Sequence, residues 1–158
     1  MMQAPNYQYR KFKSMYGLAT VEFALLMALG FTPLVLGTVE IGRVLYQYNT
    51  IVKSVRNSAR YISLYSATGP NYATQVTNAK CLAAFGNTAC TGSPIAPDLT
   101  AGQVSVATSN AGGSGTVVIK LVKVTVSGYS LGYVTSFFVR GGSKSFNDIS
   151  ATMRQATT

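Results

Sequence analysis

Apolar and polar residues follow three patterns along the chain, and the first is a long apolar run. Glu22 is the only charged residue between Leu18 and Val39. A helix over this stretch covers roughly 33 Å, about the thickness of the hydrocarbon core of a bilayer. The run therefore predicts a membrane-spanning helix. The carboxylate within it needs a specific reason, because a lone charge in a span costs free energy.

The second pattern is a helical period that continues beyond this run. Apolar residues recur at steps of three and four positions, and polar residues occupy the other side. The sequence predicts one helix from about Leu18 to about Leu64, disturbed at Pro33 because the proline ring clashes with the preceding turn. We expect the later half of its apolar side to pack on a domain of the same chain. The apolar positions are Ile41, Val44, Leu45, Tyr48, Ile51, Val52, Val55, Ala59 and Ile62, and the polar ones are Arg43, Gln47, Asn49, Lys53, Arg56, Asn57 and Arg60.

The third pattern is short and alternating, and it predicts a small α+β head. The stretch SATGPN at 66–71 is a helix stop and turn, and a second helix is expected from Tyr72 to Phe85. Three alternating or β-branched runs then predict a three- or four-stranded antiparallel sheet, with both helices covering one face. The runs begin at Gln103, Thr116 and Asp148, with a Gly-rich turn at 110–115 between the first two.

One aromatic segment, from Tyr129 to Gly142, fits neither period. It is consistent with a loop folded back onto the sheet, or with an exposed apolar surface for a partner. The patterns together divide the chain into four parts. These are a basic leader at 1–17, a membrane and assembly helix at 18–39, an amphipathic continuation at 40–65 and an α+β head at 66–158.

The charge is strongly positive but dispersed. The chain has 13 Lys and Arg against 4 Asp and Glu, a net charge of +9, and ten of the basic residues follow Leu18. A nucleic-acid binder would concentrate these residues in one patch with interleaved aromatics, and no part of the sequence does so. The pattern favours solubility and attraction to anionic envelope surfaces, and no specific nucleic-acid partner is expected.

The residues that catalysis requires are largely missing from the sequence. The chain has no His, and its acids are Glu22, Glu40, Asp98 and Asp148. Asp98 and Asp148 could form a carboxylate pair, but no nucleophile or metal ligand accompanies them. We therefore expect no enzyme, no metal and no cofactor. A ligand-binding head remains an alternative, through Lys120, Lys123, Arg140, Lys144 and Arg154, although Lys120 and Lys123 lie on opposite faces of a strand.

The two cysteines, Cys81 and Cys90, lie nine positions apart. This spacing excludes a CxxC redox pair, and two cysteines without His exclude a zinc cluster. They form either a disulfide, which would stabilise the head by roughly 2.5 to 3 kcal/mol on the chain-entropy model, or two separate buried thiols.

Basic residues flank the apolar run on both sides, so the distribution of positive charge does not decide which end of the helix faces the cytoplasm. A disulfide would place the C-terminal side outside the reducing cytosol.

The leader at 1–17 is polar and basic. An ordinary secretory signal has an apolar region of about 7 to 15 residues followed by a small-residue cleavage site. Here the run is longer and no A-x-A pattern follows it, so cleavage after the span is not expected. Beyond the span, Glu40 and Arg43 are spaced to form an ion pair that orients the helix at the membrane interface.

The residues around the start of the run resemble the processing site of type IV prepilins. A basic leader precedes Gly17, Glu22 is the fifth residue after it and an apolar helix follows. The stretches EFA, VEIGR and ARY further resemble TadE-like proteins of tight-adherence (Flp, type IVc) pilus systems. The resemblance extends to about Tyr65, and the closing VTVSGY and ISATMRQ are similar to strands of that family.

The resemblance implies that a membrane-embedded prepilin peptidase cuts between Gly17 and Leu18 on the cytoplasmic side. TadE-like proteins are regarded as minor pilins or pseudopilins that prime or cap a filament. The chain that remains after cleavage, Leu18 to Thr158, is long enough to include a head, which favours this minor role. The implied partners are the peptidase, other pilins and minor pilins, the inner-membrane assembly platform and membrane lipid. The implied location is the bacterial inner membrane, with one span and a periplasmic head. Whether the chain also enters an extracellular pilus is left open by the resemblance.

The resemblance also explains why the apolar run contains the charged residue Glu22. Cleavage creates a cationic α-amino group at Leu18, one helical turn from Glu22, which can pair with that amine or with the amine of an adjacent subunit. Glu22, with Phe23 beside it, is thus expected to set assembly and axial register. The alternative is a glutamate that reaches to the cytoplasmic interface. The alternative function is a signal-anchored periplasmic binding or adhesion domain that is not built into a filament.

Overall fold

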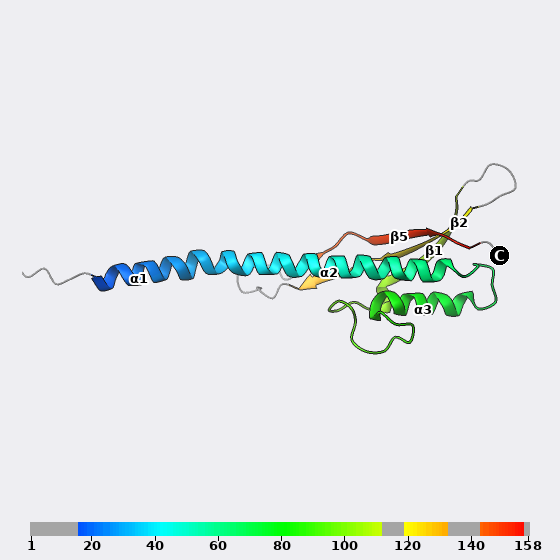
Figure 1. The fold of residues 1–158 in the computed structure, drawn as a ribbon, viewed down its shortest axis with the longest axis horizontal. Helices are drawn as coiled ribbons and strands as arrows, with labels where there is room; N and C mark the ends of the chain where they lie inside the picture. Colours follow the sequence, from blue (N-terminus) through cyan, green and yellow to red (C-terminus); the bar gives the residue numbers. More distant parts are fainter. Residues whose placement is uncertain (1–15, 112–118, 133–142, 157–158) are drawn as a thin grey trace, which may run out of the picture. The chain divides into compact units, whose positions relative to one another are not determined.

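The computed structural model describes residues 16–111, 119–132 and 143–156. The chain is α+β, as the sequence predicts, with a long N-terminal helix, a second helix and a three-stranded antiparallel sheet (Figure 1). It divides into two compact units, Met1–Thr38 and Val39–Thr158. The helical segment Gly17–Ser63 belongs to both of them.

The N-terminal helix contains one irregular turn. It consists of α1 (Tyr16–Leu26), a π-helical turn η1 (Met27–Phe31) and α2 (Thr32–Ser63). The Thr32 N–H donates to the carbonyl of Met27, one residue further back than in an α-helix. Pro33 follows directly, and because its ring clashes with the carbonyl four residues before it, the wider turn relieves that contact. The disturbance predicted near Pro33 therefore takes the form of a π turn.

The second helix, α3 (Tyr72–Phe85), has the bounds that the sequence predicts. It ends at Gly86, whose φ of 75° is left-handed and whose N–H donates to the carbonyl of Leu82. Glycine suits this position because it has no Cβ to clash with the backbone. Within the head, α3 lies beside α2 on one face of the sheet (Figure 1).

Small residues bring α2 and α3 close together. The Ser58 hydroxyl donates to the carbonyl of Ala79 at 2.6 Å, and the Ser54 hydroxyl donates to the carbonyl of Ala83 at 2.8 Å. Ser58, Ala79 and Ala83 are completely buried. Each serine thus satisfies its own polar group at the place where it lets the helix backbones approach.

We expect Ser58→Leu to lower the free energy of unfolding of the head by about 1 to 3 kcal/mol or more, because the larger side chain overpacks a filled site. Urea unfolding of the full chain in micelles measures this. Asn57→Leu is the matched control, since Asn57 is exposed on the same helix. Equal destabilisation by both variants would contradict the packing described here.

The sheet has the strand order β1-β2-β5, all antiparallel. A short 3₁₀ turn, η2 (Ala101–Gln103), precedes β1 (Val104–Ala111), which pairs with β2 (Ile119–Val126), and β2 pairs with β5 (Ile149–Arg154). Alternate residues of β2 are buried, and its two faces differ as period two requires. The turn predicted at 110–115 begins too early, because Asn110 and Ala111 still pair with β2. Residues 112–118 lie outside the described residues.

The core lies between the two helices and this sheet. Four residues of α2, Ile51, Val55, Ala59 and Ile62, are at most 1 % exposed. They meet buried residues of α3, the loop after it and the strands, which are Ala79, Ala83, Ala84, Ala96, Leu99, Val104, Val122, Val124, Val126, Tyr129 and Ile149. The later half of the amphipathic helix thus packs on its own head, as predicted.

The aromatic segment begins in the core. Tyr129 is 2 % exposed and stacks on Phe146 with ring centroids 6.0 Å apart, and Phe146 stacks on Tyr48 at 5.9 Å. Two short strands, β3 (Ser130–Gly132) and β4 (Ser143–Ser145), pair as a separate sheet rather than as a fourth strand. The start of the segment therefore folds back onto the head. Residues 133–142 lie outside the described residues.

The burial of Tyr129 is expected to make the stability of the head fall at alkaline pH. Burial raises the pKa of the Tyr129 hydroxyl, and the negative charge of Asp98 raises it further, whereas Arg43 opposes the shift. Because the folded pKa exceeds the unfolded value of about 10, this contribution to stability is complete below about pH 10. It is lost as the pH rises from there toward the folded value.

We expect Tyr129→Phe to reduce the alkaline loss of stability while changing the free energy of unfolding at pH 7 by less than about 1 kcal/mol. The Tyr129 hydroxyl has no hydrogen-bond partner among the described residues, so little is lost with it. Urea unfolding at pH 7 and above pH 10 tests this, with Tyr46→Phe as the control because Tyr46 is 73 % exposed. An unchanged alkaline loss in Tyr129→Phe would count against this role.

Candidate processing and assembly site

The predicted processing residues lie in the first turns of α1. Gly17 and Leu18 are both exposed, and a methyl group on Gly17 would meet no described atom within 4 Å. The Thr20 hydroxyl donates to the carbonyl of Gly17 at 3.0 Å. Both residues of the predicted cut are thus open to an enzyme along this stretch of helix.

Glu22 lies one helical turn after Leu18, so both residues occupy the same side of α1. An open depression of about 370 Å³ joins the Glu22 side chain to apolar neighbours, Leu25, Leu26, Leu29 and Gly30. Phe23 is 62 % exposed beside it. The carboxylate thus sits within a surface that is otherwise apolar, where a cationic partner would lower its cost.

The apolar surface of this helix is uncovered. None of the residues in its 18-residue apolar window is buried. A core helix of a soluble protein would be mostly buried, whereas a membrane anchor or a signal sequence leaves such a surface for other surroundings. An apolar surface of this size requires lipid or other apolar helices. Its large exposed residues are Leu18, Val21, Phe23, Leu25, Leu26, Met27, Leu29, Phe31, Leu34, Val35 and Val39.

A salt bridge stands directly after the apolar run. Arg43 Nη2 lies 3.2 Å from Glu40 Oε1, and Glu40 is 8 % exposed. Its predicted role in orienting the helix at the membrane interface stays a prediction.

The sequence pattern places Gln47 on the polar side of the helix, but its side chain is only 7 % exposed, so that assignment is wrong. Gln47 lies seven positions after Glu40 and four before Ile51, so these residues share one face.

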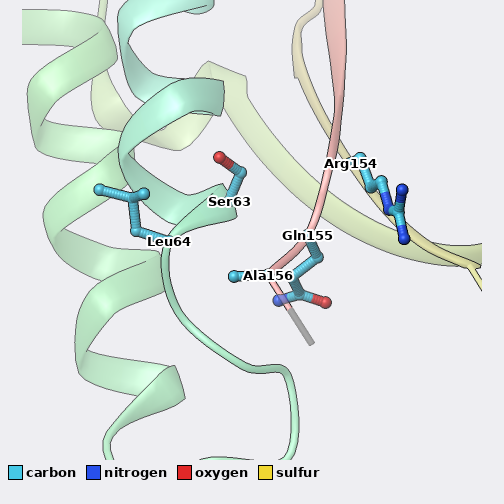
Figure 2. A pocket seen from close by; sticks show the side chains of 5 residues that line it. All are labelled: Ser63, Leu64, Arg154, Gln155 and Ala156. Carbon is cyan, nitrogen blue, oxygen red and sulfur yellow. The ribbon is translucent and has the colours of Figure 1, made fainter. Parts of the chain in front are cut away.

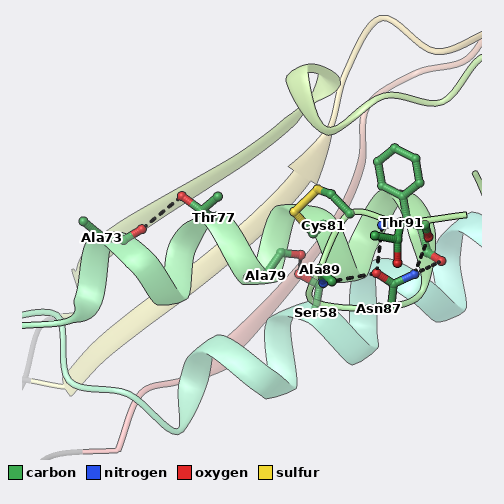
Figure 3. Close-up of a disulfide and its surroundings, with 10 residues drawn as sticks. Ser58, Ala73, Thr77, Ala79, Cys81, Asn87, Ala89 and Thr91 are labelled. Atoms are coloured by element: carbon green, nitrogen blue, oxygen red, sulfur yellow. Dashed lines mark hydrogen bonds between the residues drawn. A yellow bond between two sulfur atoms is a disulfide. The ribbon is translucent and has the colours of Figure 1, made fainter.

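The cysteines form the disulfide that was one of the two alternatives. Cys81 in α3 is bonded to Cys90 in the loop that follows. Asn87 holds the intervening turn, because its Oδ1 accepts from the N–H groups of Ala89 and Thr91 while its Nδ2 donates to the Thr91 carbonyl at 2.6 Å (Figure 3). The bond fits an oxidising compartment for the head.

The basic residues proposed for ligand binding do not gather in one patch among the described residues. Lys123 and Arg154 are exposed. Lys120 lies on the face of β2 opposite to Lys123, as predicted, and this is the face that packs on the core. Arg154 lines an open pocket of about 440 Å³ with Ser63, Leu64, Gln155 and Ala156 (Figure 2). Arg140 lies outside the described residues, and Lys144 is described only through its backbone, which pairs with Leu131 in the β3–β4 sheet. The described residues contain no metal-binding cluster.

Comparison with known protein families gives one match, which covers the helix. Residues 17–60 match the family model described as TadE-like protein. This segment is TadE-like. The TadE-like segment begins at Gly17, the residue before the predicted cut, and ends within α2, so it omits the sheet. No curated protein and no solved structure matches the chain significantly.

The match agrees with the TadE-like resemblance read from the N-terminal part of the sequence, which suggests a protein associated with tight-adherence pili, and it does not extend to the C-terminal strands. The family is in general not enzymatic. The exposed apolar helix is consistent with a membrane-anchored pilus component, which would interact with other pilus proteins.

Several structural residues were missed by reasoning from the sequence. Ser54 and Ser58 were not singled out, although their four-residue spacing along the apolar side of α2 was visible. Asn87 carried no signal beyond its place in a turn-rich loop. Ile41 and Leu45 were grouped with the apolar side but are more than half exposed.

Proposed function

We propose that this chain is a minor pilin or pseudopilin of a tight-adherence type IV pilus, in which it initiates, caps or helps to assemble the filament. A prepilin peptidase cuts it between Gly17 and Leu18. One observation carries the proposal. The TadE-like match begins at Gly17 and continues into an uncovered apolar helix whose lone carboxylate lies four positions after Leu18.

The charge pairing explains why the carboxylate is retained. Cleavage leaves a cationic amine at Leu18, and Glu22 pairs with that amine in its own chain or in a neighbouring pilin. A charge in an apolar setting is costly when alone and much less so when paired. A subunit inserted with the wrong axial register would leave both charges unpaired. Assembly therefore selects the register in which they meet, and Phe23 packs beside the pair.

The disulfide and the apolar helix support a single-span topology. The leader lies in the cytoplasm, the apolar helix crosses the inner membrane and the head with its Cys81–Cys90 disulfide lies in the periplasm. The membrane helix is 18–39, and 40–65 continues it into the head at 66–158. Other pilins, the assembly platform and lipid then contact the apolar helix, and the peptidase acts at the leader.

A second candidate is a signal-anchored periplasmic domain that binds or adheres without entering a filament. It is favoured by the unit Val39–Thr158, which has a core of its own. Such a domain needs its anchor but does not need a free amine at Leu18 or a carboxylate at Glu22. The two candidates therefore differ in their dependence on processing.

We expect a strain that lacks this chain to lose most of its surface pili, and the wild-type chain to restore them. Gly17→Val blocks the cut and fails to restore pili. The matched control is Gly42→Val, because Gly42 is another helical glycine with open space around its Cβ position. Electron microscopy of negatively stained cells provides the count. Full restoration by Gly17→Val would favour the anchored domain instead.

A further inference from the structure

An exposed surface of α2 continues beyond the apolar run. Ile41, Leu45 and Tyr48 are 63 %, 55 % and 40 % exposed, although they belong to the same compact unit as the head. The sequence pattern placed them on the side that packs, but the apolar residues of α2 are fully buried only from Ile51 onward. Ile41, Leu45 and Tyr48 thus leave accessible apolar surface on α2, beside the buried face that contains Glu40, Gln47 and Ile51. One ring face of Tyr48 stacks on Phe146.

Two adjacent rows of residues define this surface, and we call it the α2 double row. Each row repeats at every fourth residue, so its members lie one above another along the helix. Both rows begin with apolar residues and end with basic ones. The first row is Ile41, Leu45, Asn49 and Lys53, and the second is Tyr48, Val52, Arg56 and Arg60.

The basic end of the double row has no acid within it. Lys53, Arg56 and Arg60 are exposed and lie within about 11 Å along the helix. Of the four acids in the chain, Glu40 is the only one on α2, and it is buried and bonded to Arg43. The exposed surface of α2 beyond Glu40 therefore carries positive charge only.

This charge pattern disfavours a second, parallel copy of the chain as the occupant. Two copies anchored in one membrane run parallel, and parallel packing of two double rows would place Lys and Arg against Lys and Arg, which repel each other across an interface. A lipid surface is equally unsuited. Arg60 lies about 32 Å beyond Val39 along the helix, which exceeds the Debye length of about 8 Å several times.

We propose that the α2 double row binds an amphipathic helix of a different, acidic subunit of the same pilus system. This proposal rests on the proposed function and names the kind of neighbour the subunit takes. The occupant presents apolar side chains to Ile41, Leu45 and Tyr48, and Asp or Glu to the basic end. Charge then selects a heterotypic neighbour and prevents the chain from polymerising with itself through this face.

The test uses the full chain in micelles and two designed peptides of equal length. Both peptides form amphipathic helices with an apolar first half, and the second half carries Glu in one and Lys in the other. Fluorescence anisotropy at several salt concentrations gives the affinities. We expect the Glu peptide to bind, with affinity falling as salt rises, and the Lys peptide to bind at least about tenfold more weakly.

Variants separate the two ends of the double row. The double variant Lys53→Gln, Arg56→Gln is expected to bind the Glu peptide about tenfold more weakly. The affinity should also depend less on salt, because two charge contacts are lost. Leu45→Ala weakens binding without changing the salt dependence. The matched control is Lys80→Gln with Lys123→Gln, which removes the same charge from α3 and β2 and leaves binding unchanged.

Several results would overturn the proposal. These are equal binding of the two peptides, equal loss in the control pair, self-association of the chain that Leu45→Ala abolishes, or displacement of the Glu peptide by vesicles of anionic lipid. The mass of the same preparations is read in parallel. If the chain is cut after Gly17 but does not bind the Glu peptide, only this proposal is refuted. If the chain is not cut, the proposed function is refuted.

Discussion

Replacing Glu22 by alanine is expected to leave the chain cut and inserted in the membrane but to reduce piliation by at least about tenfold. The carboxylate is the only charge in the apolar run, and it lies one turn from the amine that cleavage creates. Without it that amine is left unpaired in apolar surroundings, and the free energy lost is large enough to exceed a factor of ten in assembly. Pilus counts and the mass of the membrane-bound chain measure the two effects separately.

Two further variants identify the charge as the cause. Glu22→Gln keeps the shape of the side chain and removes its charge, so it should behave like Glu22→Ala. Glu22→Asp keeps the charge on a shorter side chain and should retain part of the piliation. Normal piliation with Glu22→Gln would show that the carboxylate only reaches to the interface, and the register argument would then be wrong.

The second large effect concerns the disulfide. Replacing both Cys81 and Cys90 by serine is expected to lower the free energy of unfolding of the head by about 2.5 to 3 kcal/mol, since the open chain gains entropy when it unfolds. Urea unfolding of the full chain, with and without reductant, measures this. Reductant should destabilise the wild type and leave the double variant unchanged. A wild type that is indifferent to reductant would refute the estimate.

The elements with strong local signals were predictable. The helix Tyr72–Phe85 has a turn before it and a glycine after it, so its bounds follow from the sequence. The long helix and the three strands of the sheet carry clear periods. The short strands β3 and β4 were missed, because each is too short to establish a period.

The misplacements have a common physical cause. Periodicity tells which residues share a face of α2, but not which part of that face the head covers. Ile41 was therefore grouped with Ile51, although one is exposed and the other buried, and polar Gln47 was placed outside although it lies on the buried face. Coverage depends on tertiary packing.

The processing site stays a prediction, and it rests on a signal that is local in the sequence. A basic leader, Gly17, Glu22 and an apolar run occur in a fixed order, and that order is local in the sequence. The serines that bond α2 to α3 are not local, because Ser58 and Ala79 lie 21 positions apart. Their roles require the fold.

The central claim is tested most directly by the N-terminal residue of the mature chain. The chain is expressed in a membrane with and without its cognate prepilin peptidase, and its intact mass and N-terminal sequence are determined. The account predicts a chain that starts at Leu18 only when the peptidase is present. An uncut chain, or a cut beyond the span near Gly42, would contradict it.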